Sequence, residues 1–104
     1  MIRHIVMWNF KEEFSDEENL RNAQKVKAEL DALASTIQGI IFFEVIISTL
    51  KSGNRDIVLN SLLTDEKALA EYQVHPEHIR VSDYVGTVMK NRSCIDYIEQ
   101  SHKD

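Results

Sequence analysis

The chain has 104 residues, of which 43% are hydrophobic and 28% charged, and its formal net charge is −5 at pH 7. This length is near the common size of one domain, and the composition is that of an ordinary globular protein. Nucleic acids and anionic membranes are bound by concentrated Lys and Arg, so the acidic balance and the scattered basic residues argue against both as partners.

Residues 2–10 are rich in β-branched and aromatic side chains, which predicts the first strand. Polar residues from Asn9 onward interrupt the apolar stretch that a signal peptide needs. No apolar run approaches the ~20 residues that span a bilayer. We therefore expect a cytoplasmic protein.

Ser15 and Glu18 stand at the spacing of a capping box, in which each side chain bonds to the backbone of the other residue. This pattern predicts that a long helix begins at Ser15. Apolar residues then recur at spacings of three and four and predict one buried stripe: Leu20, Ala23, Val26, Leu30, Leu33 and Ile37. Gly39 follows as the expected end of the helix.

Residues 40–50 predict a second strand and residues 56–63 a third, joined through the turn-forming residues 51–54. Thr64 or Asp65 is expected to cap a short helix that runs to about residue 72. Pro76 then breaks this helix, because the residue before a proline avoids the helical region, although Pro76 can itself begin another turn.

Residues 85–98 predict the last strand, and residues 100–104 a frayed polar tail after a single domain at residues 1–99. Cys94 is the only cysteine, so the chain cannot form an internal disulfide, and a reducing compartment fits best. A packed strand residue is the preferred interpretation of Cys94 over a nucleophile.

The order β-α-β-β-α-β predicts an α+β fold of the ferredoxin-like type, an antiparallel sheet with its helices on one face. The expected strands are apolar on both faces, as in residues 2–10, where His4, Val6, Trp8 and Phe10 alternate with Ile5 and Met7. The helices cover only one face. We therefore predict a homodimer in which two sheets pack face to face as a dimeric α/β barrel.

The segment from Tyr72 to His78 is the richest in side chains that could carry chemistry. One interpretation makes His75 a helix cap and His78 a hydrogen-bonded buried histidine. A second makes His78 a general base, because an imidazole pKa near ~6.5 suits proton transfer at neutral pH. A third, the weakest, is a metal site of His75 and His78 with His4 or Asp56.

Three sequence blocks carry a resemblance to a known family: Arg3 to Phe10, Asp56 to Leu59, and Leu69 to His78 with its Tyr-x-x-His-Pro-x-His element. Asp96-Tyr97 adds a late match. With these, the chain resembles the stress-responsive α/β-barrel (Dabb) family over nearly its whole length. The resemblance implies the ferredoxin-like protomer and the dimeric barrel.

One plant branch of this family closes linear polyketides without a cofactor, and there the residues matching His78 and Tyr72 act as base and partner. A second histidine of that branch lies on the third strand, at the position where this chain has Asp56. The helix positions that are aromatic in that branch are expected here at Ala23, Gln24 and Lys27, which predicts a smaller and more polar cavity. Trp8 is expected to fill core space.

Two functions follow as hypotheses. In the first, a pocket between sheet and helices binds or transforms an apolar, aromatic or keto small molecule; His78 is the base, Tyr72 its partner, and the ligand lies against His4, Trp8, Asp56 and His75. A cofactor-free oxygenase is a variant of this hypothesis, and neither version requires a metal or cofactor. In the second, the protein is a non-catalytic homodimer whose polar cluster is structural.

Overall fold

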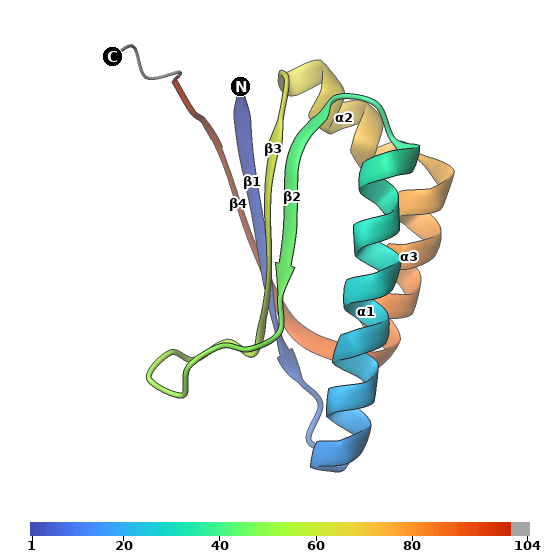
Figure 1. The fold of residues 1–104 in the computed structure, drawn as a ribbon, viewed down its shortest axis with the longest axis vertical. Coiled ribbons are helices and arrows are strands. Elements are labelled where there is room, and N and C mark those ends of the chain that lie inside the picture. Colours follow the sequence, from blue (N-terminus) through green and yellow to red (C-terminus); the bar gives the residue numbers. More distant parts are fainter. Residues whose placement is uncertain (101–104) are drawn as a thin grey trace.

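The computed structural model describes residues 1–100, which form one sheet and a layer of helices (Figure 1). Apart from Gln100, the expected frayed tail lies outside the described residues. None of the helices in residues 1–100 combines the length and the apolar character needed to cross a membrane. The elements are β1 (Ile2–Phe10), α1 (Asp16–Thr36), β2 (Ile40–Ile46), β3 (Ile57–Leu63), α2 (Glu66–Val74), α3 (Pro76–Val88) and β4 (Met89–Ile98).

The four strands pair antiparallel in the order β2-β3-β1-β4, so that β1 lies inside the sheet between β3 and β4. All the helices lie on the same face of this sheet (Figure 1). The structure confirms the predicted ferredoxin-like α+β class. It also confirms the predicted bounds of the first strand.

The start of α1 is the predicted capping box. The hydroxyl oxygen of Ser15 accepts a hydrogen bond from the backbone of Glu18 at 3.2 Å, and the Glu18 carboxylate accepts one from the backbone of Ser15 at 3.0 Å. The predicted apolar stripe is buried against the sheet from Ala23 to Ile37. Leu20 is the exception, with 54% of its surface exposed, because the buried stripe passes through Asn19 at this turn and Leu20 lies beside it.

The prediction for residues 85–98 was partly wrong, because residues 85–88 belong to a helix. Val81, Val85 and Val88 follow one another at spacings of four and three and form a buried stripe on α3. Valine favours strands by propensity, but burial of a helical stripe outweighs that weak preference. The chain therefore has a third helix between α2 and β4.

The second strand is shorter than predicted and ends at Ile46. The backbone amide of Asp56 donates to the carbonyl of Trp8 at 2.9 Å, which ties the chain to β1 and leaves residues 47–55 as a loop. A register shift between Ile40 and Phe42 also turns Ile40 toward the core and leaves Ile41 exposed. Strict alternation along residues 40–50 would place Ile41 on one face with Phe43 and Val45, and the register shift breaks that alternation.

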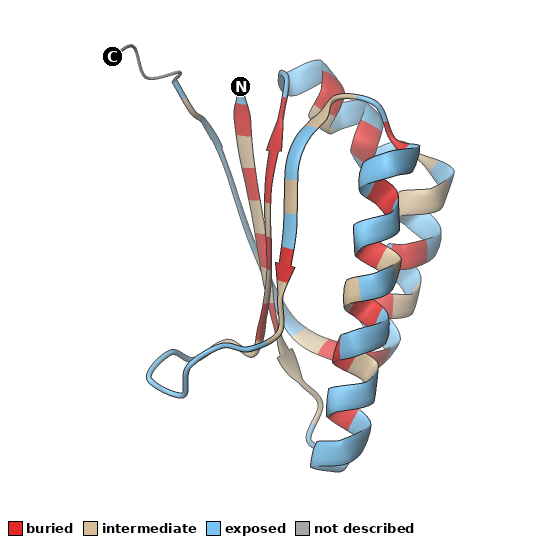
Figure 2. Cartoon of the chain, viewed as in Figure 1, coloured by how far each residue is buried: buried red, intermediate tan, exposed pale blue. Residues whose placement is uncertain are grey.

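The core lies between the sheet and the helices, where both layers turn their buried residues toward each other (Figure 2). On β1 the buried residues alternate strictly, so that Ile2, His4, Val6 and Trp8 face the helices. Two of these four side chains, His4 and Trp8, carry polar nitrogen. The inner face of β1 can thus provide polar groups to a site between the sheet and the helices.

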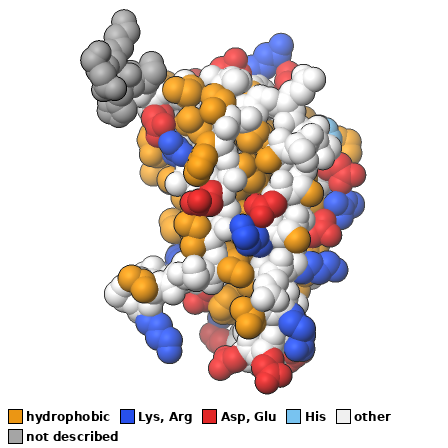
Figure 3. Space-filling view, viewed as in Figure 1, with side chains coloured by type: hydrophobic (Ala, Val, Ile, Leu, Met, Phe, Trp, Pro, Cys, Tyr) orange, Lys and Arg blue, Asp and Glu red, His pale blue; other side chains and the backbone are white. Residues whose placement is uncertain are grey.

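The opposite face of the sheet, here called the open face, is mainly apolar, as predicted. The strand registers place eight apolar side chains on it: Ile5, Met7, Phe42, Ile46, Val58, Leu62, Ile95 and Tyr97. Arg3 adds a polar group at one end, where it donates to Glu99 at 2.8 and 2.9 Å and to Asn60 at 3.0 Å. Hydrophobic side chains gather on this strand side of the molecule in Figure 3.

Gly39 is expected to tolerate no side chain. Its φ of +90° is unfavourable for other residues, and an added Cβ would lie 2.7 Å from the Cβ of Ala68. Gly39→Ala should lower the free energy of unfolding by about 1–3 kcal/mol, measured by urea denaturation. Gly53→Ala is the control, because the nearest atom to its added Cβ lies at 3.8 Å. Equal stability of the two variants would contradict this account.

Candidate functional site

A cavity of about 210 Å³ lies between the inner face of the sheet and the helices. The sheet lines it with His4, Val6, Trp8, Leu59, Met89 and Arg92. The helices line it with Leu30, Tyr72, His78, Ser82, Val85 and Gly86. The structure therefore brings together four of the six predicted site residues: His4, Trp8, Tyr72 and His78.

Tyr72, on α2, is the most deeply buried of the polar lining residues, with 1% of its surface exposed. Its hydroxyl group has no hydrogen-bond partner among the described residues. Burial raises the pKa of Tyr72 well above the usual 10, so the hydroxyl keeps its proton at any physiological pH. The cavity thus contains a hydrogen-bond donor whose capacity is unused.

His78 lies in the first turn of α3, close to Tyr72. The two ring centres are 4.3 Å apart. The Nδ1 atom of His78 lies 3.1 Å from the carbonyl oxygen of Gln73, a geometry in which Nδ1–H donates and Nε2 stays a free acceptor. Burial lowers the pKa of His78 below the usual 6.5, with smaller contributions from His4 and Arg92. A neutral imidazole with a free Nε2 is the form that can take a proton.

The local sequence explains why Tyr72 and His78 meet although they lie on different helices. The backbone amide of Glu77 donates to the Nδ1 atom of His75 at 3.1 Å, so His75 caps α3 directly after α2 ends. Pro76 occupies the first helical position, where its missing amide proton costs nothing. The break between the helices folds His78 back toward Tyr72.

His4 is 2% exposed, and its ring meets that of Tyr72 edge-on with 5.8 Å between the centres. Its Nδ1 atom bonds to the carboxylate of Asp96, which is its direct partner across β1 and β4. This bond fixes the imidazole ring through Nδ1 and does not involve the second ring nitrogen, Nε2. Asp96 is thus the carboxylate that orients a histidine of this site.

The role of Asp96 was not predicted from the sequence. The only sequence signal was the place of Asp96 in the late Asp-Tyr match. Its pairing with His4, which lies 92 positions away in sequence, follows from the register between β1 and β4. Arg92 was missed as well, because nothing in the sequence distinguishes it from the other basic residues.

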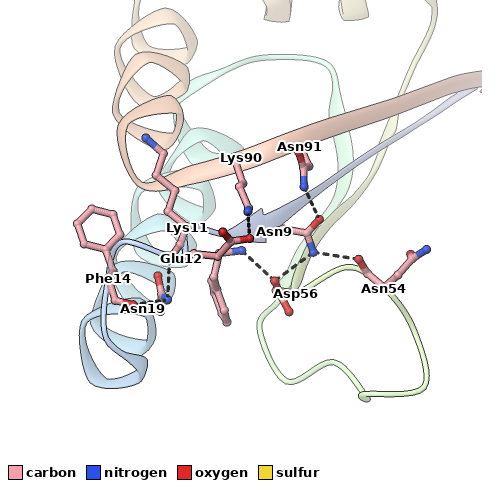
Figure 4. A network of polar contacts seen from close by, with 10 residues as sticks. Asn9, Lys11, Glu12, Phe14, Asn19, Asn54, Asp56, Lys90 and Asn91 are labelled. Atoms are coloured by element: carbon pink, nitrogen blue, oxygen red, sulfur yellow. Dashed lines mark hydrogen bonds and ion pairs between the residues drawn. The ribbon is translucent and has the colours of Figure 1, made fainter.

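Asp56 lies outside the cavity, at the far end of β1 (Figure 4). Its carboxylate accepts hydrogen bonds from the backbone of Phe10 at 2.8 Å and from the side chain of Asn9 at 3.1 Å. Ser61, not Asp56, is the residue of β3 that pairs with His4, five positions further along the chain and roughly 16 Å away. The predicted contact of Asp56 with the ligand site is not supported by its position.

His75 also lies outside the cavity, because its ring nitrogen is used in the cap of α3. With Asp56 elsewhere, the residues of the proposed metal set do not converge. In residues 1–100 the side chains that could hold a metal gather instead at His4, Cys94 and Asp96. Cys94 is exposed on the edge strand, contrary to the prediction of a packed residue. Partial burial of the thiol group and the nearby charge of Asp96 raise the pKa of Cys94.

The first helix contributes Leu30 to the cavity, and the expected positions Ala23, Gln24 and Lys27 do not line it. Lys27 instead donates to the carbonyl of Val45 at 3.0 Å and to Asp31 at 3.1 Å. The expectation that these three positions line the cavity was therefore wrong. Trp8 both lines the cavity and packs in the core.

The sequence matches the family profile described as "Stress responsive A/B Barrel Domain" over residues 2–99. No curated protein matches it. Among solved structures, a dimeric protein of unknown function with a ferredoxin-like fold from Bacteroides fragilis is 26% identical, with 92% of this chain and 93% of that chain covered and a TM-score of 0.84.

Two further structures show the range of this fold. A Dabb family protein from Mesorhizobium loti is 25% identical over 96% of this chain and 97% of that chain, with a TM-score of 0.72. A hydroxynitrile lyase from Passiflora edulis is 11% identical over 99% of this chain and 96% of that chain, with a TM-score of 0.80. At that identity the likeness of the lyase shows the fold alone.

Proposed function

Because the chain belongs to the stress responsive A/B barrel domain family, a membership that shows the fold and leaves the reaction open, we propose its function from the cavity itself. The protein is a homodimeric enzyme that removes a proton from a carbon atom next to a carbonyl group of a small, largely apolar molecule. His78 is the general base, and Tyr72 stabilises the oxygen on which negative charge develops.

One observation carries this proposal: a histidine with a free Nε2 stands beside the ring of a buried tyrosine whose hydroxyl has no partner among residues 1–100. Buried polar groups are nearly always hydrogen-bonded, so an unpaired hydroxyl on a residue that lines a cavity suits a ligand oxygen. The pKa of His78 is lowered by burial and that of Tyr72 is raised by it, so at neutral pH one group is a ready base and the other a donor.

The proposed step needs no further reagent. Nε2 of His78 takes the proton as the C–H bond breaks, and the electron pair of that bond forms a C=C bond to the carbonyl carbon. The carbonyl π electrons move onto oxygen, which accepts a hydrogen bond from the Tyr72 hydroxyl. The His4–Asp96 pair lies against Tyr72 and holds that side of the cavity in place. His4 and Asp96 are positioning residues here.

The homodimer is part of the proposal. The open face has apolar side chains on all four strands, and Ile95, Tyr97 and Phe42 are each more than 40% exposed. Burial of such a face gains about 25 cal/mol per Å², which can exceed the cost of association. The Bacteroides fragilis relative of the same fold is described as dimeric. Two open faces packed together would give the barrel that the family name describes.

Deuterium exchange tests the proposed activity. Phenylpyruvate has a methylene group beside its keto group, and its loss of the methylene proton signal in D₂O is measured by NMR. We expect the protein to accelerate this exchange above the buffer rate. Because only neutral His78 accepts a proton and its pKa lies below 6.5, the rate should rise with pH through an apparent pKa below 6.5 and then stay level.

An exchange rate equal to that of buffer from about pH 5 to about pH 8, the range in which histidine titrates, would contradict the enzyme proposal. That result would favour the non-catalytic homodimer, in which Tyr72 and His78 serve only the core. Consumption of dissolved oxygen during the reaction would instead favour the cofactor-free oxygenase.

A further inference from the structure

The charge of the cavity lining is one-sided. Of the residues that line it, Arg92 is the one with a fixed charge, and no Asp or Glu of the described chain is among them. His4 and His78 are the other ionisable nitrogen bases, and Tyr72 stays protonated. A ligand inside the cavity therefore meets a positive charge that no lining carboxylate neutralises.

Arg92 differs from Arg3, Arg80 and Lys90 in that no carboxylate partner is found for it among residues 1–100. In the described part of the chain, Arg3 pairs with Glu99, Arg80 with Glu77 and Glu29, and Lys90 with Glu12. For Arg92 the side-chain contact is with the thiol of Cys94, a weak acceptor. A guanidinium group has five N–H donors, so most of its capacity remains free.

The charge of Arg92 reaches the proposed catalytic groups across the cavity. It lowers the pKa of His78 and opposes the rise in the pKa of Tyr72. Both effects on pKa are those expected of a positive charge, which disfavours a second positive charge and favours a negative charge inside the cavity. Arg92 is therefore placed to attract an anionic group of the molecule that Tyr72 and His78 also contact.

The size and walls of the cavity limit the rest of that molecule. Its 210 Å³ lies below the ~300–1,000 Å³ of pockets that hold drug-sized ligands. Val6, Trp8, Leu30, Leu59 and Val85 provide an apolar wall. A single ring or a short branched chain fits these limits better than a fused ring system.

We infer that the ligand is a small carboxylic acid, with an apolar body of about one ring, whose carboxylate is bound by the guanidinium of Arg92 at the β4 side of the cavity. Arginine suits this role because its planar fork matches the two oxygens of a carboxylate. The inference rests on the proposed function for the site, but it concerns recognition and not the proton transfer.

The binding of two unreactive probes tests recognition of the carboxylate separately from proton transfer. 3-Phenylpropanoate and 3-phenylpropanamide differ in charge at one end and share the same apolar body, and their dissociation constants are measured by NMR titration. We expect the acid to bind about 10- to 100-fold more tightly than the amide, as for a charge-assisted hydrogen bond. Arg92→Gln should remove most of this preference and leave amide binding unchanged. Arg92→Lys should retain part of it.

Lys90→Gln is the matched control, because it removes an equal charge from the same strand at a residue that does not line the cavity. It should keep the preference for the acid. Equal binding of acid and amide, no measurable binding of either probe, or full retention of the preference in Arg92→Gln would overturn the inference. Acid-selective binding without deuterium exchange would support this inference while the proposed proton transfer fails.

Discussion

Replacing His78 with alanine is expected to lower the rate of phenylpyruvate exchange about 10²- to 10⁴-fold, the usual contribution of a general base. His4 also lines the cavity, with its Nδ1 bonded to Asp96 and its Nε2 left over, but its ring centre lies 5.8 Å from that of Tyr72, against 4.3 Å for His78. The shorter separation assigns the base role to His78. The rate is measured by NMR at saturating phenylpyruvate, and circular dichroism confirms that the variant is folded.

Ile79→Ala is the control for this variant. Ile79 is the next residue of α3, is 48% exposed and does not line the cavity, so exchange should remain close to the wild-type rate. If His78→Ala exchanged as fast as the wild type while folded, His78 would not be the base.

Tyr72→Phe separates the roles of the two groups. Loss of the hydroxyl should lower exchange about 10- to 100-fold, somewhat less than the loss of a full oxyanion-hole donor. Stability should not fall, because the hydroxyl has no hydrogen-bond partner among residues 1–100. Full activity in Tyr72→Phe would remove the donor role and leave that of His78 standing.

The second large effect concerns assembly. Ile95→Lys is expected to convert a dimer into a monomer at micromolar concentration, because a lysine on the open face would have to be buried unpaired in the interface. In the protomer Ile95 is 53% exposed, so the fold itself should tolerate the change. Sedimentation equilibrium of wild type and variant measures the result.

Leu20→Lys is the matched control, because Leu20 is 54% exposed but lies on α1, on the other side of the molecule. This variant should remain dimeric. A wild-type protein that sediments as a monomer at micromolar concentration, or an Ile95→Lys variant that stays dimeric, would contradict the open face as the interface.

Local patterns were enough to predict much of the fold. The capping box at Ser15 and the dense β-branched run at residues 2–10 each depend on neighbours within a few positions, and both were predicted correctly. The boundary between α3 and β4 was not, because Val81, Val85 and Val88 satisfy both a strand preference and a helical spacing. Only the packing of α3 against the core decides between them.

The candidate site was predictable in its short-range part and not in its long-range part. Tyr72 and His78 lie six positions apart around a proline, and that segment alone marked both as candidates, although it did not show that they touch. The pairing of His4 with Asp96, the remote position of Asp56 and the presence of Arg92 in the wall all depend on strand register. Register is set by the turns and by burial over the whole sheet, which no single segment records.

The alternation along β1 has a consequence for how such a protein can change. Even-numbered residues such as His4 and Val6 face the cavity, and odd-numbered residues such as Ile5 and Met7 face outward. Ligand preference and partner choice can therefore evolve independently through point mutations in one short segment. A single inserted or deleted codon within β1 would instead exchange the two sets of side chains and damage both properties at once.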